Sequence, residues 1–127
     1  MCFFVLIACM GCANIVAPSG GPKDITAPKL IEAIPQNPSI NFNKNKIVLV
    51  FDEYVQIENI DNIQISPICE PTPEIRVRGK KIEIILGCNL DSLATYTINF
   101  GHTIVDVNEN NILENFKYVF SKNNQID

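Results

Sequence analysis

From Lys29 onward, apolar and polar residues alternate in short bursts, and clusters of proline, glycine and asparagine separate the bursts about every ten residues. A period of two places the apolar side chains on one face of a β-strand, whereas a helix needs a period of 3.6. No window of the sequence sustains the helical period, and we expect at most one helical turn, near Ile57, Ile60 and Ile63. The pattern predicts an all-β, antiparallel sandwich.

Seven stretches carry this alternation, and seven strands fit the immunoglobulin-like count. They are Leu30 to Ile34, Lys46 to Phe51, Ile63 to Ser66, Glu74 to Arg78, Lys81 to Leu86, Thr95 to Phe100 and Phe116 to Ser121. The chain has 127 residues, which suffices for one domain with one core. Two such domains would not fit, since domains usually have about 100 to 150 residues.

The hairpin around Gly79 and Lys80 is the most detailed local prediction. If these two residues form the loop, with Gly79 at positive φ, the register of the flanking strands is determined. The facing pairs are then Arg78 with Lys81, Val77 with Ile82, Arg76 with Glu83, and Ile75 with Ile84. The aliphatic residues Ile75, Val77, Ile82, Ile84 and Leu86 share the inner face, and Arg76 and Glu83 form a cross-strand ion pair on the outer face.

The amino terminus has the length of an export signal. Residues 1–10 are all apolar. This run is too short for a transmembrane helix of about 20 residues and is typical of a secretory signal. Gly11 precedes Cys12, as in the lipobox of bacterial lipoproteins, so we expect residues 1–11 to be a signal and Cys12 to be lipidated. Cys9 stands where that motif prefers leucine, and no basic residue precedes the run. An uncleaved anchor and a non-secreted start therefore remain open alternatives.

The rest of the chain divides by composition. Residues 12–28 contain Pro18, Ser19, Gly20, Gly21 and Pro22. This composition predicts a flexible tether after the lipidated cysteine. Residues 29–121 form the predicted sandwich domain, and residues 122–127 a polar tail.

Several pieces of the chain, in this order, resemble one family. They are residues 12–28, 47–55 (IVLVFDEYV), 96–101 (YTINFG), 104–108 (IVDVN) and 116–121 (FKYVFS). Together they resemble the SbsA-type bacterial Ig-like domain, as found in surface lipoproteins of Bacteroidetes. The resemblance implies an Ig-like sandwich that serves as a structural or adhesive module of the cell envelope, without shared catalytic residues. It also implies that related proteins often continue beyond this domain.

Composition excludes several classes of function. The formal net charge is −4 and the pI is about 4.9. A basic surface for nucleic acid is therefore not expected. His102 is the only histidine, which excludes multi-histidine metal sites. Asp52 and Glu53 are adjacent on a strand end and point to opposite faces, so a paired-carboxylate catalytic site is not expected there.

Asp106, Asn108 and Asn110 alternate along one loop, like the first oxygen ligands of a calcium loop. The position that needs glycine holds Asn111, and the position that needs a bidentate glutamate holds Lys117. The pattern leaves a weak calcium site open. The alternative is a turn in which Asn110 and Asn111 accept left-handed backbone and Asp106 binds backbone amides.

Two further features concern stability. Cys69 and Cys88 are the cysteines left once Cys2 and Cys9 are removed with the signal and Cys12 is acylated. The hairpin register brings Cys69 within two residues of the position facing Cys88, so an exported chain could form a disulfide; two unlinked small hydrophobic residues are the alternative. Tyr96, at the start of a strand, is expected to bond back to the backbone as a tyrosine corner.

The combined expectation is a non-enzymatic, lipid-anchored protein of the cell envelope, on the periplasmic or surface face of the outer membrane. Its expected partners are the membrane, through the lipid anchor, and an envelope protein or polysaccharide, with no nucleic acid. No cofactor is expected apart from the weak calcium site at Asp106. The alternative is a truncated fragment, or an accessory module of a longer, carbohydrate-acting envelope protein.

Overall fold

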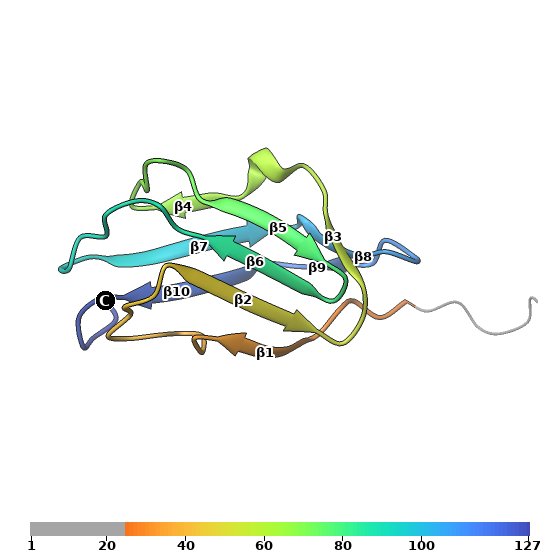
Figure 1. Cartoon of the computed structure of the whole chain (residues 1–127). Coiled ribbons are helices and arrows are strands. Elements are labelled where there is room, and N and C mark those ends of the chain that lie inside the picture. The colour runs from red at the N-terminus through yellow and green to blue at the C-terminus, as the bar shows by residue number, and fades with distance from the viewer. Residues whose placement is uncertain (1–24) are drawn as a thin grey trace, which may run out of the picture.

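The computed structural model describes residues 25–127, which fold into ten β-strands and one 3₁₀ turn. The first sheet has four antiparallel strands in the order β1 (Leu30–Ile34), β2 (Lys46–Phe51), β6 (Lys81–Ile85) and β5 (Glu74–Arg78). The second has the order β10 (Phe116–Ser121), β7 (Thr95–Gly101) and β4 (Gln64–Ser66). A small third sheet orders β3 (Val55–Ile57), β8 (Ile104–Asp106) and β9 (Ile112–Leu113). The two larger sheets enclose the core of a β-sandwich (Figure 1).

All seven predicted strands are present, each within one residue of its expected bounds. The count of about seven was too low, because β3, β8 and β9 were not predicted. These strands have two or three residues each, too few for a period of two to be recognised. The predicted helical turn is the 3₁₀ turn η3 (Ile60–Asn62), whereas Ile57 lies in β3.

The hairpin of β5 and β6 has the predicted register, from Arg78 opposite Lys81 to Ile75 opposite Ile84. Gly79 has a φ of 65°, so it supplies the left-handed conformation that the turn needs. The register also pairs Glu74 with Ile85. The turn chemistry alone therefore fixed how these two strands align.

The hairpin differs from the prediction at Val77, which is 38% exposed rather than inside. Ile82 and Ile84 are fully buried, and Ile75 is partly buried. The reason is topological: β6 lies between β2 and β5, whereas β5 is the outer strand of its sheet. An outer strand has a hydrogen-bonded strand of its own sheet on only one side, so its aliphatic side chains are buried less completely than those of β6.

The predicted ion pair between Arg76 and Glu83 was wrong. The two residues face each other in the register, but Arg76 Nε donates to Glu74 Oε2, 2.8 Å away on the same strand and face. Glu83 accepts from Arg78 Nε at 3.2 Å and lies 3.5 Å from Lys46 Nζ. Because β6 is a central strand, Glu83 has basic neighbours on both sides. The two nearest, Lys46 on β2 and Arg78 on β5, lie diagonal to it rather than directly opposite.

Aromatic residues dominate the part of the core between β7 and β10. Phe120 packs against three other rings, with centroid distances of 4.7 Å to Phe42, 5.4 Å to Tyr96 and 5.8 Å to Tyr118. All four rings are buried. Aliphatic residues of β2 and β6 fill the opposing sheet, with Ile47, Leu49, Ile82 and Ile84 completely inaccessible to water.

We call the side of the sandwich where residues 35–42 lie along β10 the closed edge. Ser39 pairs with β10 in the parallel direction, donating to Val119 O at 2.9 Å and accepting from Ser121 N at 2.9 Å. Phe42 N then donates to Ser121 O at 2.8 Å. The Tyr118 hydroxyl donates to Pro35 O at 2.7 Å. The outer strand of the second sheet is therefore covered by the chain itself.

The described chain begins and ends at opposite ends of the sandwich (Figure 1). At the first end, Lys29 N donates to Asp52 Oδ1 at 2.9 Å, just after β2. At the other end, Asp127 N donates to Thr95 Oγ1 at 2.9 Å, at the start of β7. No helix within residues 25–127 is long and apolar enough to cross a membrane. The predicted signal, Cys12 and most of the predicted tether lie outside the described residues.

Candidate functional site

An apolar cleft lies on the side of the sandwich away from the closed edge. β4 and β5 are the outer strands here, one from each sheet, and we call this side the open edge. The cleft has a volume of about 260 Å³. It is lined by Ile60, Asp61, Ile63, Ile65, Thr72, Pro73, Ile75, Ile84 and Ile98.

The side chains that line the cleft are mostly apolar. Asp61 is its one charged residue, and Thr72 supplies the other polar side chain. General acid and base catalysis needs positioned titratable groups that converge on a substrate atom, and the lining offers a single carboxylate for that purpose. The cleft therefore fits an apolar side chain or strand better than a reacting substrate.

The loop after β8 is organised by the buried carboxylate of Asp106. Asp106 Oδ1 accepts backbone N–H groups from Glu109 at 2.7 Å and from Asn110 at 2.9 Å. Asp106 Oδ2 accepts the side-chain amide of Asn111 at 2.9 Å. Asn110 has a φ of 61°, so it takes the left-handed backbone expected of the turn pair. These contacts support the second of the two interpretations of the loop, in which Asp106 holds a turn.

The electrostatics of Asp106 result from these contacts. Burial raises the pKa of the carboxyl group, because it disfavours the charged form. The hydrogen bonds from Glu109, Asn111 and Asn110 act in the opposite direction and prevail, so the net pKa is below the ordinary value of 3.8. Asp106 is therefore ionised at neutral pH, and amide donors stabilise its charge.

The other two residues of the calcium pattern lie at the surface of the loop. Asn108 and Asn110 are exposed, and the Asn110 side-chain oxygen accepts from Gln56 Nε2 at 3.0 Å. Both oxygens of Asp106 already have N–H partners. Within residues 25–127, no group of three or more histidine, cysteine, aspartate or glutamate side chains could hold a metal ion.

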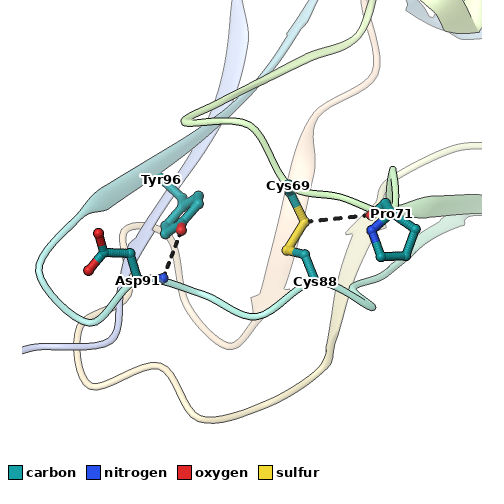
Figure 2. Close-up of a disulfide and its surroundings, with 5 residues drawn as sticks. All are labelled: Cys69, Pro71, Cys88, Asp91 and Tyr96. Carbon is teal, nitrogen blue, oxygen red and sulfur yellow. Dashed lines mark hydrogen bonds between the residues drawn. A yellow bond between two sulfur atoms is a disulfide. The ribbon is translucent and has the colours of Figure 1, made fainter.

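The structure joins Cys69 and Cys88 in a disulfide, with Cα atoms 5.3 Å apart (Figure 2). Cys69 lies in the connection between β4 and β5, and Cys88 comes after β6. Cys69 is buried and Cys88 is partly buried against the core. The bond ties the connection at the open edge to the strand next to β5.

Two buried tyrosines have structural roles. The Tyr96 hydroxyl accepts from the backbone N–H of Asp91 at 2.8 Å, which confirms the predicted tyrosine corner (Figure 2). Tyr118 was not predicted to have a role, and its hydroxyl binds Pro35 O, 83 residues away in sequence. Burial raises the pKa of Tyr118 to about 12, with a hydrogen bond to Ser39 acting in the opposite direction. Tyr118 is therefore a neutral donor at the closed edge.

The other candidate residues do not assemble into a site. Asp52 binds the backbone of Lys29 through Oδ1, and His102 is exposed, as predicted for a residue at a strand end. Asp52 comes directly after β2, whereas His102 lies between β7 and β8. Asp52 therefore holds the start of the domain in place through its hydrogen bond with Lys29 N.

Residues 24–122 match the family described as Bacterial Ig-like domain. The chain belongs to this family. The match covers the sandwich and all of its described strands, so the predicted Ig-like fold class is confirmed. No curated protein sequence matches the chain.

Among solved structures, the Ig-like domain is similar to PcoC, a methionine rich copper resistance protein from Escherichia coli. The TM-score is 0.51 and the sequence identity 17%, over 75% of this chain and 97% of PcoC. At this identity the likeness concerns the fold alone.

Proposed function

We propose that this Ig-like protein is a non-enzymatic, lipid-anchored component of the bacterial cell envelope whose domain is a structural spacer. The observation that carries the proposal is the placement of the two ends of the domain. The chain enters beside Asp52 and leaves beside Thr95, at opposite ends of the strands (Figure 1). A domain joined in this way sets a distance between the groups attached at its two ends.

The sequence before the domain supports anchoring at the first end. Cys12 comes after an apolar run and Gly11, as in a lipoprotein signal. Residues 13–28 have a tether composition. About fifteen flexible residues have a root-mean-square span of about 20 Å, enough to hold a folded domain clear of lipid headgroups. The resemblance to SbsA-type domains of Bacteroidetes surface lipoproteins supports the same location.

The side chains of the domain support a structural rather than a catalytic role. The buried carboxylate of Asp106 and the hydroxyl groups of Tyr96 and Tyr118 each bind backbone groups of the fold. Such buried groups stabilise a loop or a strand crossing, and their hydrogen bonds are made within the fold. An adhesive role toward a protein or a polysaccharide of the envelope is compatible with this surface.

Copper handling, named for PcoC, is not part of the proposal. PcoC is described as methionine rich, whereas Met1 and Met10 are the two methionines of this sequence. Both precede the domain, and His102 is the one histidine. Soft thioether and imidazole ligands for copper are therefore scarce in this chain.

The anchor is tested by labelling the full chain with a fatty-acid analogue in a bacterial host. We expect the wild-type chain and Cys9→Ser to carry the label in the membrane fraction, and Cys12→Ser to lose it. The Cys9→Ser variant is the matched control, because it removes a neighbouring thiol from the same apolar segment. Equal labelling of Cys9→Ser and Cys12→Ser would contradict lipidation at Cys12.

The spacer role is tested by measuring which end of the domain lies near the membrane. Lys80 and Lys44 are both exposed, and they lie beside the end and before the start of β2, respectively. We expect energy transfer to a lipid-soluble dye to be stronger from a fluorophore on Lys80→Cys than from one on Lys44→Cys. Equal transfer from the two positions would contradict a domain standing on its first end.

A further inference from the structure

The outer side of β5 offers backbone groups for pairing. β6 pairs with β5 on one side. On the other side no strand within residues 25–127 belongs to the same sheet, although β3 lies near the end of β5 and Val55 N donates to Gly79 O at 3.1 Å. Arg78 and Lys81 flank the two-residue turn and therefore form a hydrogen-bonded pair. Because such pairs alternate along an antiparallel ladder, Ile75 and Val77 direct their N–H and C=O groups away from β6.

The side chains of β5 alternate between charged and aliphatic residues. Strands that avoid pairing commonly carry charged side chains, especially lysine, or a proline. β5 has the sequence Glu-Ile-Arg-Val-Arg, with both signs on the outer face and aliphatic residues on the inner face. Val77 is 38% exposed, and Ile75 lines the cleft of the open edge. The strand therefore combines open backbone groups with an uncovered apolar side.

The order of the charges is self-complementary. When two β5 strands lie antiparallel and centred on Arg76, Glu74 of each copy faces Arg78 of the other. In the same register, Ile75 of each copy faces Val77 of the other, and these are the residues with outward backbone groups. Each of these aliphatic pairs can exchange both N–H···O bonds. Backbone pattern and charge pattern thus select the same alignment.

The neighbouring alignments are poorer. A shift of two residues in one direction places Pro73 opposite Val77, and proline has no N–H to donate. A shift of two residues in the other direction places Arg76 opposite Arg78, and like charges that face each other destabilise a strand pair. In the central alignment Arg76 faces Arg76 of the other copy. Each guanidinium is, however, paired with Glu74 of its own chain, with 2.8 Å between Nε and Oε2.

We infer that a second copy of this chain pairs with β5, joining two four-stranded sheets into one continuous antiparallel sheet. The pairing places Val77 of one copy beside Ile75 of the other, at the mouth of the apolar cleft. It therefore covers the exposed aliphatic residue of the hairpin. The partner surface is therefore β5 of the second copy. This self-association goes beyond the proposed spacer role and does not require the lipid anchor.

The pairing is tested by cross-linking the full chain in cells with a short, cell-permeant bismaleimide. The two copies of Arg76 occupy a non-hydrogen-bonded position, where Cα atoms are about 4.5 Å apart. The two copies of Arg78 are four residues out of register, or about 13 Å apart along the strand. We expect Arg76→Cys to give a dimer several-fold above wild type, and Arg78→Cys to remain at the wild-type level. The reagent acts in every compartment, and the wild-type chain measures the background from the native cysteines, so the comparison does not require anchoring at Cys12.

The charge pattern gives a second test in the Arg76→Cys background. Glu74→Arg alone and Arg78→Glu alone each place like charges opposite each other, so we expect each to reduce the dimer about fivefold. The two substitutions together restore opposite charges and should restore the dimer. Three results would overturn the inference: a dimer as strong from Arg78→Cys as from Arg76→Cys, no restoration in the double charge variant, or cross-linking of Arg76→Cys to a different protein.

Discussion

The two edges of this sandwich differ in how their outer strands are covered. At the closed edge, residues 39–42 run along β10, and the buried hydroxyl of Tyr118 reaches back to Pro35. At the open edge, β4 and β5 border an apolar cleft of about 260 Å³. Here a disulfide, rather than a covering strand, holds the connection between the outer strands.

This contrast separates two sources of stability. The closed edge depends on side chains that are buried and bonded to distant backbone, so a loss there leaves a cavity and unpaired polar groups. The open edge depends on a covalent bond that restricts the unfolded chain, and its outer strand keeps polar groups in contact with water. The open edge can therefore accept a partner with little disturbance to the fold.

The largest expected effect is at the closed edge. Tyr118→Ala removes a fully buried ring and its bond to Pro35, so we expect the free energy of unfolding to fall by about 4 kcal/mol. The matched substitution at the open edge, Ile75→Ala, removes a partly buried side chain and should cost about 1 to 2 kcal/mol. Urea unfolding at neutral pH measures both. Equal losses would show that the two edges do not differ in packing.

The disulfide is the next test, because it belongs to the open edge alone. The double substitution Cys69→Ala with Cys88→Ala releases a loop with a sequence separation of 19, and the chain-entropy argument gives a loss of about 3 kcal/mol. Reduction of the wild-type chain should produce the same loss in urea unfolding, and reduction of the double variant should produce none. A wild-type stability that does not change on reduction would contradict this role.

Asp106 lies at neither edge and tests a purely electrostatic contribution. Its pKa is lowered on folding, so its stabilisation is present above its ordinary pKa of 3.8 and is lost as the pH falls through the folded-state value. We expect Asp106→Asn to cost about 2 kcal/mol at pH 7, with the cost shrinking in acid below that ordinary value. Asp61→Asn, an exposed carboxylate of the cleft, is the control. A cost that is constant from pH 7 to pH 3 would argue against an ionised Asp106.

The smallest expected effect concerns the ion pairs beside the open edge. Glu83→Gln removes the contacts with Lys46 at 3.5 Å and Arg78 at 3.2 Å, while the two basic side chains keep substantial contact with water. Such pairs contribute little to folding. We expect the urea midpoint to stay within the error of the measurement. A clear fall in the midpoint would show that charge, rather than aliphatic packing, holds the β5–β6 hairpin.

The sequence predicted well the features that depend on neighbouring residues. Alternation located β1, β2, β5 and β10 at their observed bounds, and Gly79 set the register of the hairpin. Both signals act within a few residues. The tyrosine corner at Tyr96 is also local, since its partner Asp91 is five residues away.

The features that it missed depend on contacts between distant segments. Nothing near Tyr118 indicates that its hydroxyl reaches Pro35, which is 83 residues earlier. The exposure of Val77 required knowing that β5 is an outer strand, and the partners of Glu83 required knowing that β2 lies beside β6. The Asp106 loop left two alternatives because oxygen-rich spacing is common to cation loops and to turns held by amides.

The parallel pairing at the closed edge has a mechanical consequence. A force that pulls on the two ends of the domain draws residues 39–42 toward the first end and β10 toward the second, because the chain enters and leaves at opposite ends. The bonds of Ser39 with Val119 and Ser121, and of Phe42 with Ser121, then carry the load together in shear. Strands loaded in this direction must break these bonds at the same time, whereas strands peeled apart from one end break them one by one. The closed edge thus lies where tension on the two ends of the domain would act first.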